Sequence, residues 1–329
     1  MPPPAVEVVH VGSACRDVAP DDPRGWRLGG GVTYAALTTA RLGLRTAAII
    51  GLDDESRDAD ELDTLRTAGV DILPVRLGEG PVYHNVETPT GRVQTIVQVG
   101  EPLPVPALPD SWLRARGWSV APVAGEITDA WAPTIPAGAY VAVAWQGSLR
   151  DLAAGERVTR RPPEASAMIR RANLVGVSHH DVAPATRLSE LWRLLQPGAD
   201  LLITQGHQGG LLIHVGEDGP TRTLRYLPTA TDDERDPTGA GDTFLAALHA
   251  SVLRPAIAGR QRARHGLDLR FAAAAGSLVV EAAGLDGVPD RGAVIRRRAR
   301  ERVRRAILPS ETTQVGTASD LEMEPALGE

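Results

Sequence analysis

Short apolar strands alternate with helical patterns along most of the chain, and this alternation constrains the fold most strongly. The first apolar strand, VEVVHV (residues 6–11), leads through a glycine turn into a helix of small residues from Val32 to Leu42. A buried strand, 46–50, follows, and further apolar strands separated by helical patterns lie between 119 and 215. Repeated strand–helix units predict an α/β fold with a mostly parallel sheet covered by helices on both faces.

Residues 82–99 follow a different pattern. Apolar or β-branched residues at 93, 95, 97 and 99 alternate with Gln94, Ile96 and Gln98, and the preceding TPTG is a turn signal. The segment therefore predicts a hairpin with one solvated face, in a small sheet outside the main layers.

Composition is that of a soluble globular protein. Of 329 residues, 43% are hydrophobic and 23% charged, which is ordinary usage. No apolar run approaches the ~20 residues that span a bilayer. The first residues, MPPPAVEV, lack the basic and apolar regions of a signal peptide. We therefore expect a cytoplasmic protein with no membrane partner.

Charge excludes several classes of site. The formal net charge is −6, which argues against a nucleic-acid partner. All 35 basic residues are arginines, so a Walker A loop, the protein-kinase lysine and a Schiff base are excluded. Arginines cluster in the helical pattern 291–307, which we interpret as a solvated terminal helix; a nucleic-acid surface is the alternative. Residues 309–329 are polar and acidic and predict a disordered tail after one domain, 1–308.

The stretch RDPTGAGDTFLAAL (235–248) carries the clearest chemical signal. Its apolar residues Phe244, Leu245 and Leu248 share one face of a helix that begins near Asp242. Glycine and alanine ahead of that helix leave backbone N–H groups uncovered, and these groups can hold an anion. A carboxylate beside them can accept a proton from a substrate hydroxyl during phosphoryl transfer. A helix cap after a tight turn explains the same residues without any function.

Residues 236–244, DPTGAGDTF, resemble the C-terminal signature of the ribokinase, or PfkB, family of carbohydrate kinases. GSACRD with the later glycine pair, ITQGHQGGLL and FAAAAGSLVVEAAGLDGVP also resemble family segments, in the family's order, so the similarity covers about residues 5–307. The resemblance implies a ribokinase-like three-layer α/β/α sandwich with a small β lid from about 13–30 and 80–102. Only the short stretch VAPDDPRGWRL separates Asp17 from Gly29, where many family members have two lid strands, so we expect a reduced lid.

The resemblance also assigns roles to residues of this chain. It implies a catalytic base and a backbone anion hole at Asp242, Gly239, Ala240 and Gly241. The substrate-binding residues would be Asp17, Gly29, Gly30 and Tyr34. The nucleotide-binding residues would be Gly206, Gly209, Thr238, Ala274 and Ser277. Metal ligands are expected at Asp181 and Asp236.

Two positions depart from the family pattern. The segment SHHD (178–181) stands where the family usually has Asn-x-x-Glu, and Tyr34 stands where a sugar-binding asparagine is common. The segment AWQGSLR (144–150) resembles a QG-x-LR stretch of poorly characterised relatives. We expect ATP- and Mg²⁺-dependent phosphorylation of a hydroxyl of a small sugar, an inositol-like polyol or a nucleoside. A non-catalytic nucleotide or sugar sensor is the alternative. The sequence does not decide whether the protein forms a homodimer.

Overall fold

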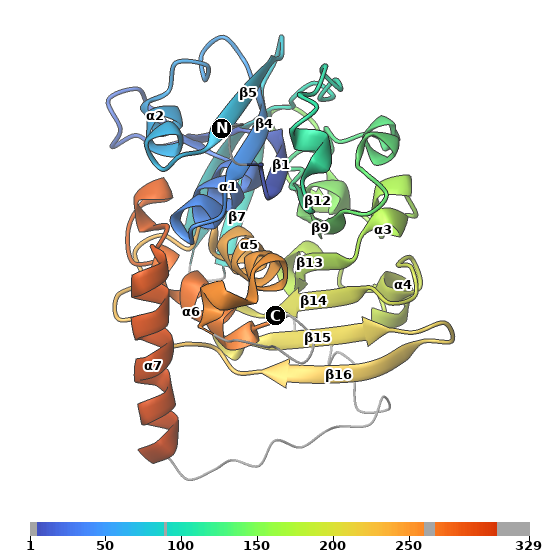
Figure 1. Cartoon of the computed structure of the whole chain (residues 1–329). Coiled ribbons are helices and arrows are strands. Elements are labelled where there is room, and N and C mark those ends of the chain that lie inside the picture. The colour runs from blue at the N-terminus through green and yellow to red at the C-terminus, as the bar shows by residue number, and fades with distance from the viewer. Residues whose placement is uncertain (1–4, 89–90, 260–266, 308–329) are drawn as a thin grey trace.

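The computed structural model describes residues 5–88, 91–259 and 267–307, and a nine-stranded sheet runs through them (Figure 1). The strand order is β16-β15-β14-β13-β9-β8-β1-β4-β5. Pairs from β14 to β5 are parallel, and only β15 and β16 join antiparallel at one edge. The strands are β1 (Val8–Ser13), β4 (Thr46–Leu52), β5 (Asp71–Arg76), β8 (Gly117–Val120), β9 (Tyr140–Ala144), β13 (Leu174–Ser178), β14 (Asp200–Thr204), β15 (Gly210–Val215) and β16 (Pro220–Tyr226). The mostly parallel sheet predicted from the sequence is confirmed.

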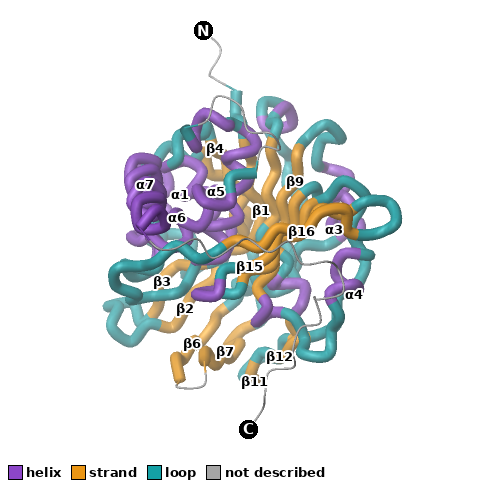
Figure 2. Tube along the Cα trace, turned by 90° about the horizontal axis from the view of Figure 1, so that it is seen from below, coloured by secondary structure: helices purple, strands orange, loops and turns teal. Residues whose placement is uncertain are grey.

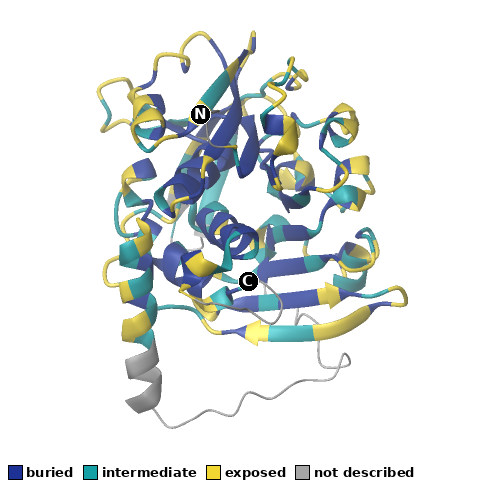
Figure 3. Ribbon diagram, in the orientation of Figure 1, coloured by how far each residue is buried: buried dark blue, intermediate teal, exposed yellow. Residues whose placement is uncertain are grey.

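Helices cover both faces of this sheet. One face carries α1 (Gly31–Arg41), α2 (Asp60–Thr67), α5 (Ala240–Leu253), α6 (Leu269–Val279) and α7 (Arg291–Ile307), and the other carries α3 (Ala167–Arg171) and α4 (Leu188–Trp192) (Figure 1). Successive strand residues belong to opposite cores: Ala47 and Ile49 pack with the α3 and α4 side, whereas Ala48 and Ile50 pack with α1 and α2. Both faces of the strands are therefore buried, as Figure 3 shows.

The lid is a five-stranded sheet of order β11-β7-β6-β2-β3 (Figure 2). Its strands are β2 (Cys15–Val18), β3 (Trp26–Gly29), β6 (Val82–Thr88), β7 (Gly91–Gln98) and β11 (Glu156–Arg157). Four of them lie in the segments expected from the sequence. The fifth, β11, comes from a segment that the sequence analysis did not assign to the lid, and a short pair formed by β10 (Arg150–Asp151) and β12 (Thr159–Arg160) flanks it in the sequence.

The last described helix, α7, differs from a purely solvated helix in one respect. Arg297 is buried, and its guanidinium bridges Glu281 (2.8 Å) and Asp232 (3.4 Å) and donates to the Ser277 hydroxyl (3.2 Å). Because a buried charge must be paired, this network fixes α7 against α6. The predicted tail, 309–329, lies outside the described residues. Among the described helices, none has the length and apolarity needed to cross a bilayer.

Candidate active site

A cavity of about 1410 Å³ lies between the lid and the main sheet. It is lined by lid residues such as Asp17 and Asn85, by the ends of β13 and β14, and by the first turn of α5. The carboxyl ends of parallel strands are the usual binding edge of such a sheet. Pockets for one drug-sized ligand measure about 300–1,000 Å³. The cavity therefore has room for two ligands side by side.

The loop before α5 brings bare backbone to the cavity wall. Gly239 has φ 78°, and a Cβ there would overlap the ring of Tyr34, so both the turn and the packing require glycine. Ala240 and Gly241 begin the helix, and all three residues line the cavity. The first N–H groups of a helix lack intrahelical partners and carry its positive dipole end. The predicted anion hole therefore lies on the wall of a cavity.

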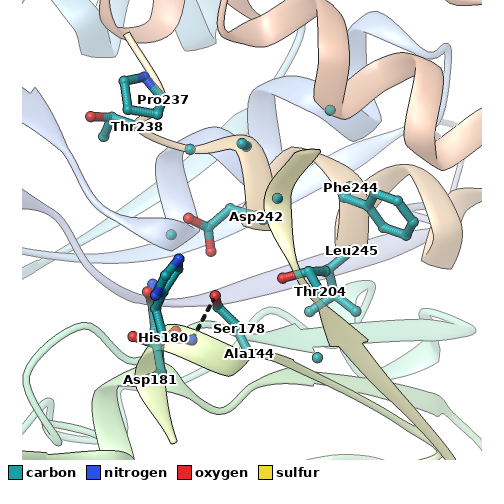
Figure 4. Close-up of a pocket in the computed structure, with 18 of the residues that line it drawn as sticks. Ala144, Ser178, His180, Asp181, Thr204, Pro237, Thr238, Asp242, Phe244 and Leu245 are labelled. Atoms are coloured by element: carbon teal, nitrogen blue, oxygen red, sulfur yellow. Dashed lines mark hydrogen bonds between the residues drawn. The ribbon is translucent and has the colours of Figure 1, made fainter. Parts of the chain in front are cut away.

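Asp242 projects from the first turn of α5 into the cavity. Figure 4 shows its carboxylate opposite Ser178, His180 and Asp181. A Cβ built at Gly31, the first residue of α1, would lie 2.7 Å from the Asp242 Oδ1 atom. The N-terminus of α1 therefore meets that of α5 at this carboxylate. Burial first, and then the negative charge of Asp181, raise the pKa of Asp242 to about 6, while the Arg150 guanidinium opposes the shift.

Asp17 lies at the lid end of the same cavity. Its Oδ1 atom accepts a hydrogen bond from the Asn85 amide (3.0 Å), and Gln94 in turn donates to the Asn85 oxygen (2.8 Å). A Cβ at Gly29 would overlap the Asp17 carboxylate, so this carboxylate lies directly against the predicted glycine pair. Burial raises the pKa of Asp17 to about 6, against the opposing charge of Arg92. The lid thus orients a carboxylate that can accept hydrogen bonds from substrate hydroxyls.

Two further predicted residues support the walls. Tyr34 is 2% exposed and lies between the acidic groups, and burial together with the charges of Asp236 and Asp17 raises its pKa well above the ordinary value. Gly30 has φ 103° at the N-cap of α1, where a Cβ would meet the Ser13 carbonyl oxygen at 2.9 Å. The tyrosine ring and the glycine backbone therefore set the shape of the cavity beside Asp17.

Asp236 organises the loop that precedes the anion hole. Its two oxygens accept hydrogen bonds from the backbone N–H groups of Thr238 (2.9 Å) and Gly284 (3.0 Å). Although burial opposes the shift, hydrogen bonding with the Thr238 side chain, together with these two backbone bonds, holds the pKa of Asp236 below its ordinary value. The lid residue Arg92 donates to the Thr238 hydroxyl (3.2 Å) and lies 3.9 Å from Asp236. A lid strand therefore contacts the loop before α5.

Asp181 follows β13 and lines the cavity close to Asp242. One of its oxygens lies 3.3 Å from the guanidinium of Arg150. Among the described residues, no group of three or more histidine, cysteine, aspartate or glutamate side chains could hold a metal ion. An all-protein metal cage is thus absent from the described part of the chain. The donor set instead fits Mg²⁺, which binds proteins through one or two carboxylates and takes its other ligands from phosphates and water.

The opposite end of the cavity contains most of the predicted nucleotide residues. Gly206, Gly209 and Ser277 line it, and Gly209 has φ 85° in a turn where a Cβ would overlap the Tyr226 carbonyl oxygen. Ala274 is fully buried in the core and does not line the cavity. Its helix, α6, turns Ala273 and Gly276 toward the cavity instead. Helix α6 therefore borders the cavity, but Ala274 lies on its core-facing side.

Sequence reasoning missed four residues that the structure brings to the site. Gly31 contacts the predicted base, Asn85 orients Asp17, Arg92 reaches the loop before α5, and Arg150 pairs with Asp181. Their positions depend on pairing between distant strands, which a single sequence does not reveal. The QG-x-LR stretch gave a signal for Arg150, but it assigned the arginine no partner.

Comparisons with known proteins find a family match in part of the sequence and a common fold in solved structures. Residues 163–291 match the model of the pfkB family of carbohydrate kinases. A cytidine kinase of Thermococcus kodakarensis is 26% identical over 267 residues, which cover 76% of this chain and 89% of that protein. The ribokinase of Giardia lamblia superposes with a TM-score of 0.67 at 16% identity, covering 91% of this chain and 100% of the other.

A third similar structure is a pyrophosphate-dependent kinase of the ribokinase family, complexed with a pyrophosphate analogue and myo-inositol. Its TM-score is 0.61 at 19% identity, and the match covers 87% of this chain and 98% of that one. The family match includes the α5 signature. Residues 163–291 are thus similar to the pfkB family of carbohydrate kinases, phosphotransferases with an alcohol group as acceptor, and the chain has a ribokinase-like fold.

Proposed function

We propose that the protein transfers the terminal phosphoryl group of ATP to a hydroxyl of a small sugar, an inositol-like polyol or a nucleoside. One observation carries the proposal: the Asp242 carboxylate lies where the N-termini of α5 and α1 meet, in the cavity that also contains Asp17. A proton acceptor, an anion hole and a hydroxyl-binding carboxylate are thereby brought together. Phosphoryl transfer requires this positioning and charge stabilisation more than it requires covalent chemistry.

In the proposed reaction, Asp17 and the backbone around Gly29 and Gly30 hold the acceptor with one hydroxyl facing Asp242. Asp242 accepts the hydroxyl proton as the oxygen attacks the terminal phosphorus atom of the donor. The N–H groups of Gly239, Ala240 and Gly241 stabilise the charge on the phosphoryl oxygens. Mg²⁺, held with the donor phosphates beside Asp181, would neutralise the remaining phosphate charge.

The part of the cavity that the acceptor does not occupy is where we place the nucleotide. We place the adenine and ribose between the turn of Gly206 and Gly209 and the α6 face of Gly276 and Ser277, all of which line the cavity. The curated relative is a cytidine kinase and one structural neighbour holds myo-inositol, which supports both nucleosides and polyols as acceptor classes. The same neighbour is pyrophosphate-dependent, so pyrophosphate is the donor to test beside ATP.

The test is turnover by the purified protein with Mg²⁺, a panel of sugars, inositols and nucleosides, and ATP or pyrophosphate as donor. We expect one acceptor class to be phosphorylated. The acid limb of kcat/KM should fall below about pH 6, because Asp242 must be ionised to act as a base and its pKa is raised to about 6. Binding of acceptors and donors without turnover at any pH, with Asp242→Asn indistinguishable from wild type, would indicate a sensor instead.

A further inference from the structure

A buried arginine outside the family signature lines the cavity. Arg150 starts β10, directly after the short 3-10 helix Gln146–Leu149, and its side chain is only 9% exposed. We propose that Arg150 is a catalytic residue whose guanidinium binds oxygens of the phosphoryl group during its transfer. This inference rests on the proposed kinase function and adds a residue to it.

The contacts of Arg150 fix its guanidinium between the two substrate regions. It donates to the Val123 carbonyl oxygen (3.4 Å), to the Gln146 side chain (3.2 Å) and to Asp181 (3.3 Å). The guanidinium carbon also lies 5.7 Å from the ring centroid of Tyr83, a lid residue. The arginine therefore lies beside the acceptor end of the cavity and the acidic group expected near the donor.

The positive charge of Arg150 is buried and is paired with Asp181. A buried cation is costly unless it is paired, and although burial opposes the shift, the charge of Asp181 raises the pKa of Arg150 above its ordinary value. Arg150 also counteracts the pKa rise of Asp242, so its charge is felt at the predicted base. The chain has no lysine, and a guanidinium keeps its charge at any working pH.

The guanidinium retains donor capacity for a phosphoryl group. An arginine has five N–H donors in a fixed plane. Three donate to Val123, Gln146 and Asp181, and the Tyr83 side chain is a fourth partner, which leaves one donor free among the contacts of the described residues. During transfer, charge is spread over three equatorial oxygens of the phosphoryl group, which match such a fork of donors. These oxygens would replace Asp181 as partners of Arg150 and leave that carboxylate to Mg²⁺.

The segment after Arg150 connects this position to the lid. The Gly155 N–H donates to the Ile96 carbonyl oxygen (2.7 Å), the Val158 N–H donates to that of Gln94 (2.9 Å), and β11 pairs with β7. The arginine is thus anchored on the sheet side by Asp181 and on the lid side by its own chain. Such two-sided anchoring suits a residue that must be in place before the phosphoryl group moves.

Arg150 forms no covalent bond in the proposed reaction. A bond forms between the acceptor oxygen and the terminal phosphorus, and the bond from that phosphorus to the bridging oxygen of the donor breaks. The hydroxyl proton goes to Asp242, and the bridging electron pair leaves with the donor product. Arg150 stabilises only the charge on the oxygens that move with the phosphorus.

The experiment compares Arg150→Ala and Arg150→Lys with Arg161→Ala, a control in the same segment whose partner, Glu164, is exposed. Removing a charge-stabilising donor costs about 10²–10³ in kcat. We expect that loss in Arg150→Ala with the acceptor KM nearly unchanged, a smaller loss in Arg150→Lys, and wild-type rates in the control. Millimolar guanidinium should restore part of the kcat of Arg150→Ala but none of that of Asp242→Asn.

The outcomes separate the inference from the proposed function. A wild-type protein that turns over no acceptor overturns both. A wild type that turns over while Arg150→Ala keeps its kcat, or loses it without rescue by guanidinium, overturns the role of Arg150 alone. If Arg150→Ala does not fold, Arg150→Lys replaces it: wild-type kcat in the folded lysine variant would likewise overturn the role. Tighter binding of ADP with aluminium fluoride to wild type than to Arg150→Lys provides a second supporting readout.

Discussion

Replacing Asp242 with asparagine should abolish turnover and yet stabilise the folded protein at neutral pH. The pKa of this carboxyl is raised from 3.8 to about 6 by burial in the cavity wall and by Asp181. A shift of about 2 pH units corresponds to about 3 kcal/mol of destabilisation when the group is ionised, at about 1.4 kcal/mol per unit. Because Asp242 lines an open cavity and is only partly buried, solvent screening reduces this to about 1–3 kcal/mol.

The sign follows from linkage. Because the folded state binds the proton more tightly than the unfolded state, the contribution of Asp242 to stability is fully present below about pH 4 and is lost as the pH rises through about 6. Asparagine does not titrate. The stability gained by Asp242→Asn should therefore be small near pH 4.5 and reach its full value above pH 7.

The assay is urea unfolding of ligand-free wild type and variant between pH 4.5 and 8. Asp233→Asn is the control, because Asp233 is exposed and its ion pair with Arg235 lies on the surface, where such pairs contribute little. A gain of equal size at pH 4.5 and pH 8 would show that packing rather than charge is responsible. A loss of stability at pH 8 would refute the reasoning.

Three further changes test other parts of the site. Gly239→Ala should lower the unfolding free energy by more than about 1 kcal/mol and abolish turnover, because its Cβ would overlap Tyr34, whereas Gly241→Ala, with no atom within 4 Å of its Cβ, should raise stability by about 0.5–1 kcal/mol. Equal unfolding midpoints for these two variants would contradict the packing described. Asn85→Ala should raise the acceptor KM about fivefold, since Asp17 loses a hydrogen bond of about 1 kcal/mol, and steady-state kinetics with an unchanged KM would argue against that role. Chelation of Mg²⁺ should stop turnover while acceptor binding, measured by calorimetry, persists; full activity after chelation would exclude the metal.

Much of the fold, and some of the residues that line the cavity, could be predicted from local patterns in the sequence. Alternating strands and helices predict the parallel sheet because each unit buries its own apolar residues, and the glycines before Asp242 predict bare backbone because their neighbours are small. The antiparallel strand β15 has the same apolar pattern as the parallel strands, so the sequence did not distinguish it from them. The edge strand β16, PTRTLRY, is mostly polar and exposed, so its pattern did not predict a strand.

Contacts between distant segments could not be predicted. Arg150 meets Asp181, and Asn85 meets Asp17, only once the main sheet and the lid have set their registers. The choice of Ala274 over Ala273 failed for a related reason: which face of α6 borders the cavity depends on packing against α5, and the alanine run FAAAA is equally apolar on all sides.

The origin of the lid sheet has a consequence for engineering. Its strands come from three separate stretches of chain, 15–29, 82–98 and 156–157, and the last stretch continues from the residue that pairs with Asp181. If only the first two stretches were replaced by those of a relative, the new β7 would have to pair with the original β11, which did not evolve with it. If the lid binds the acceptor as proposed, a redesign of acceptor specificity would have to exchange all three stretches together.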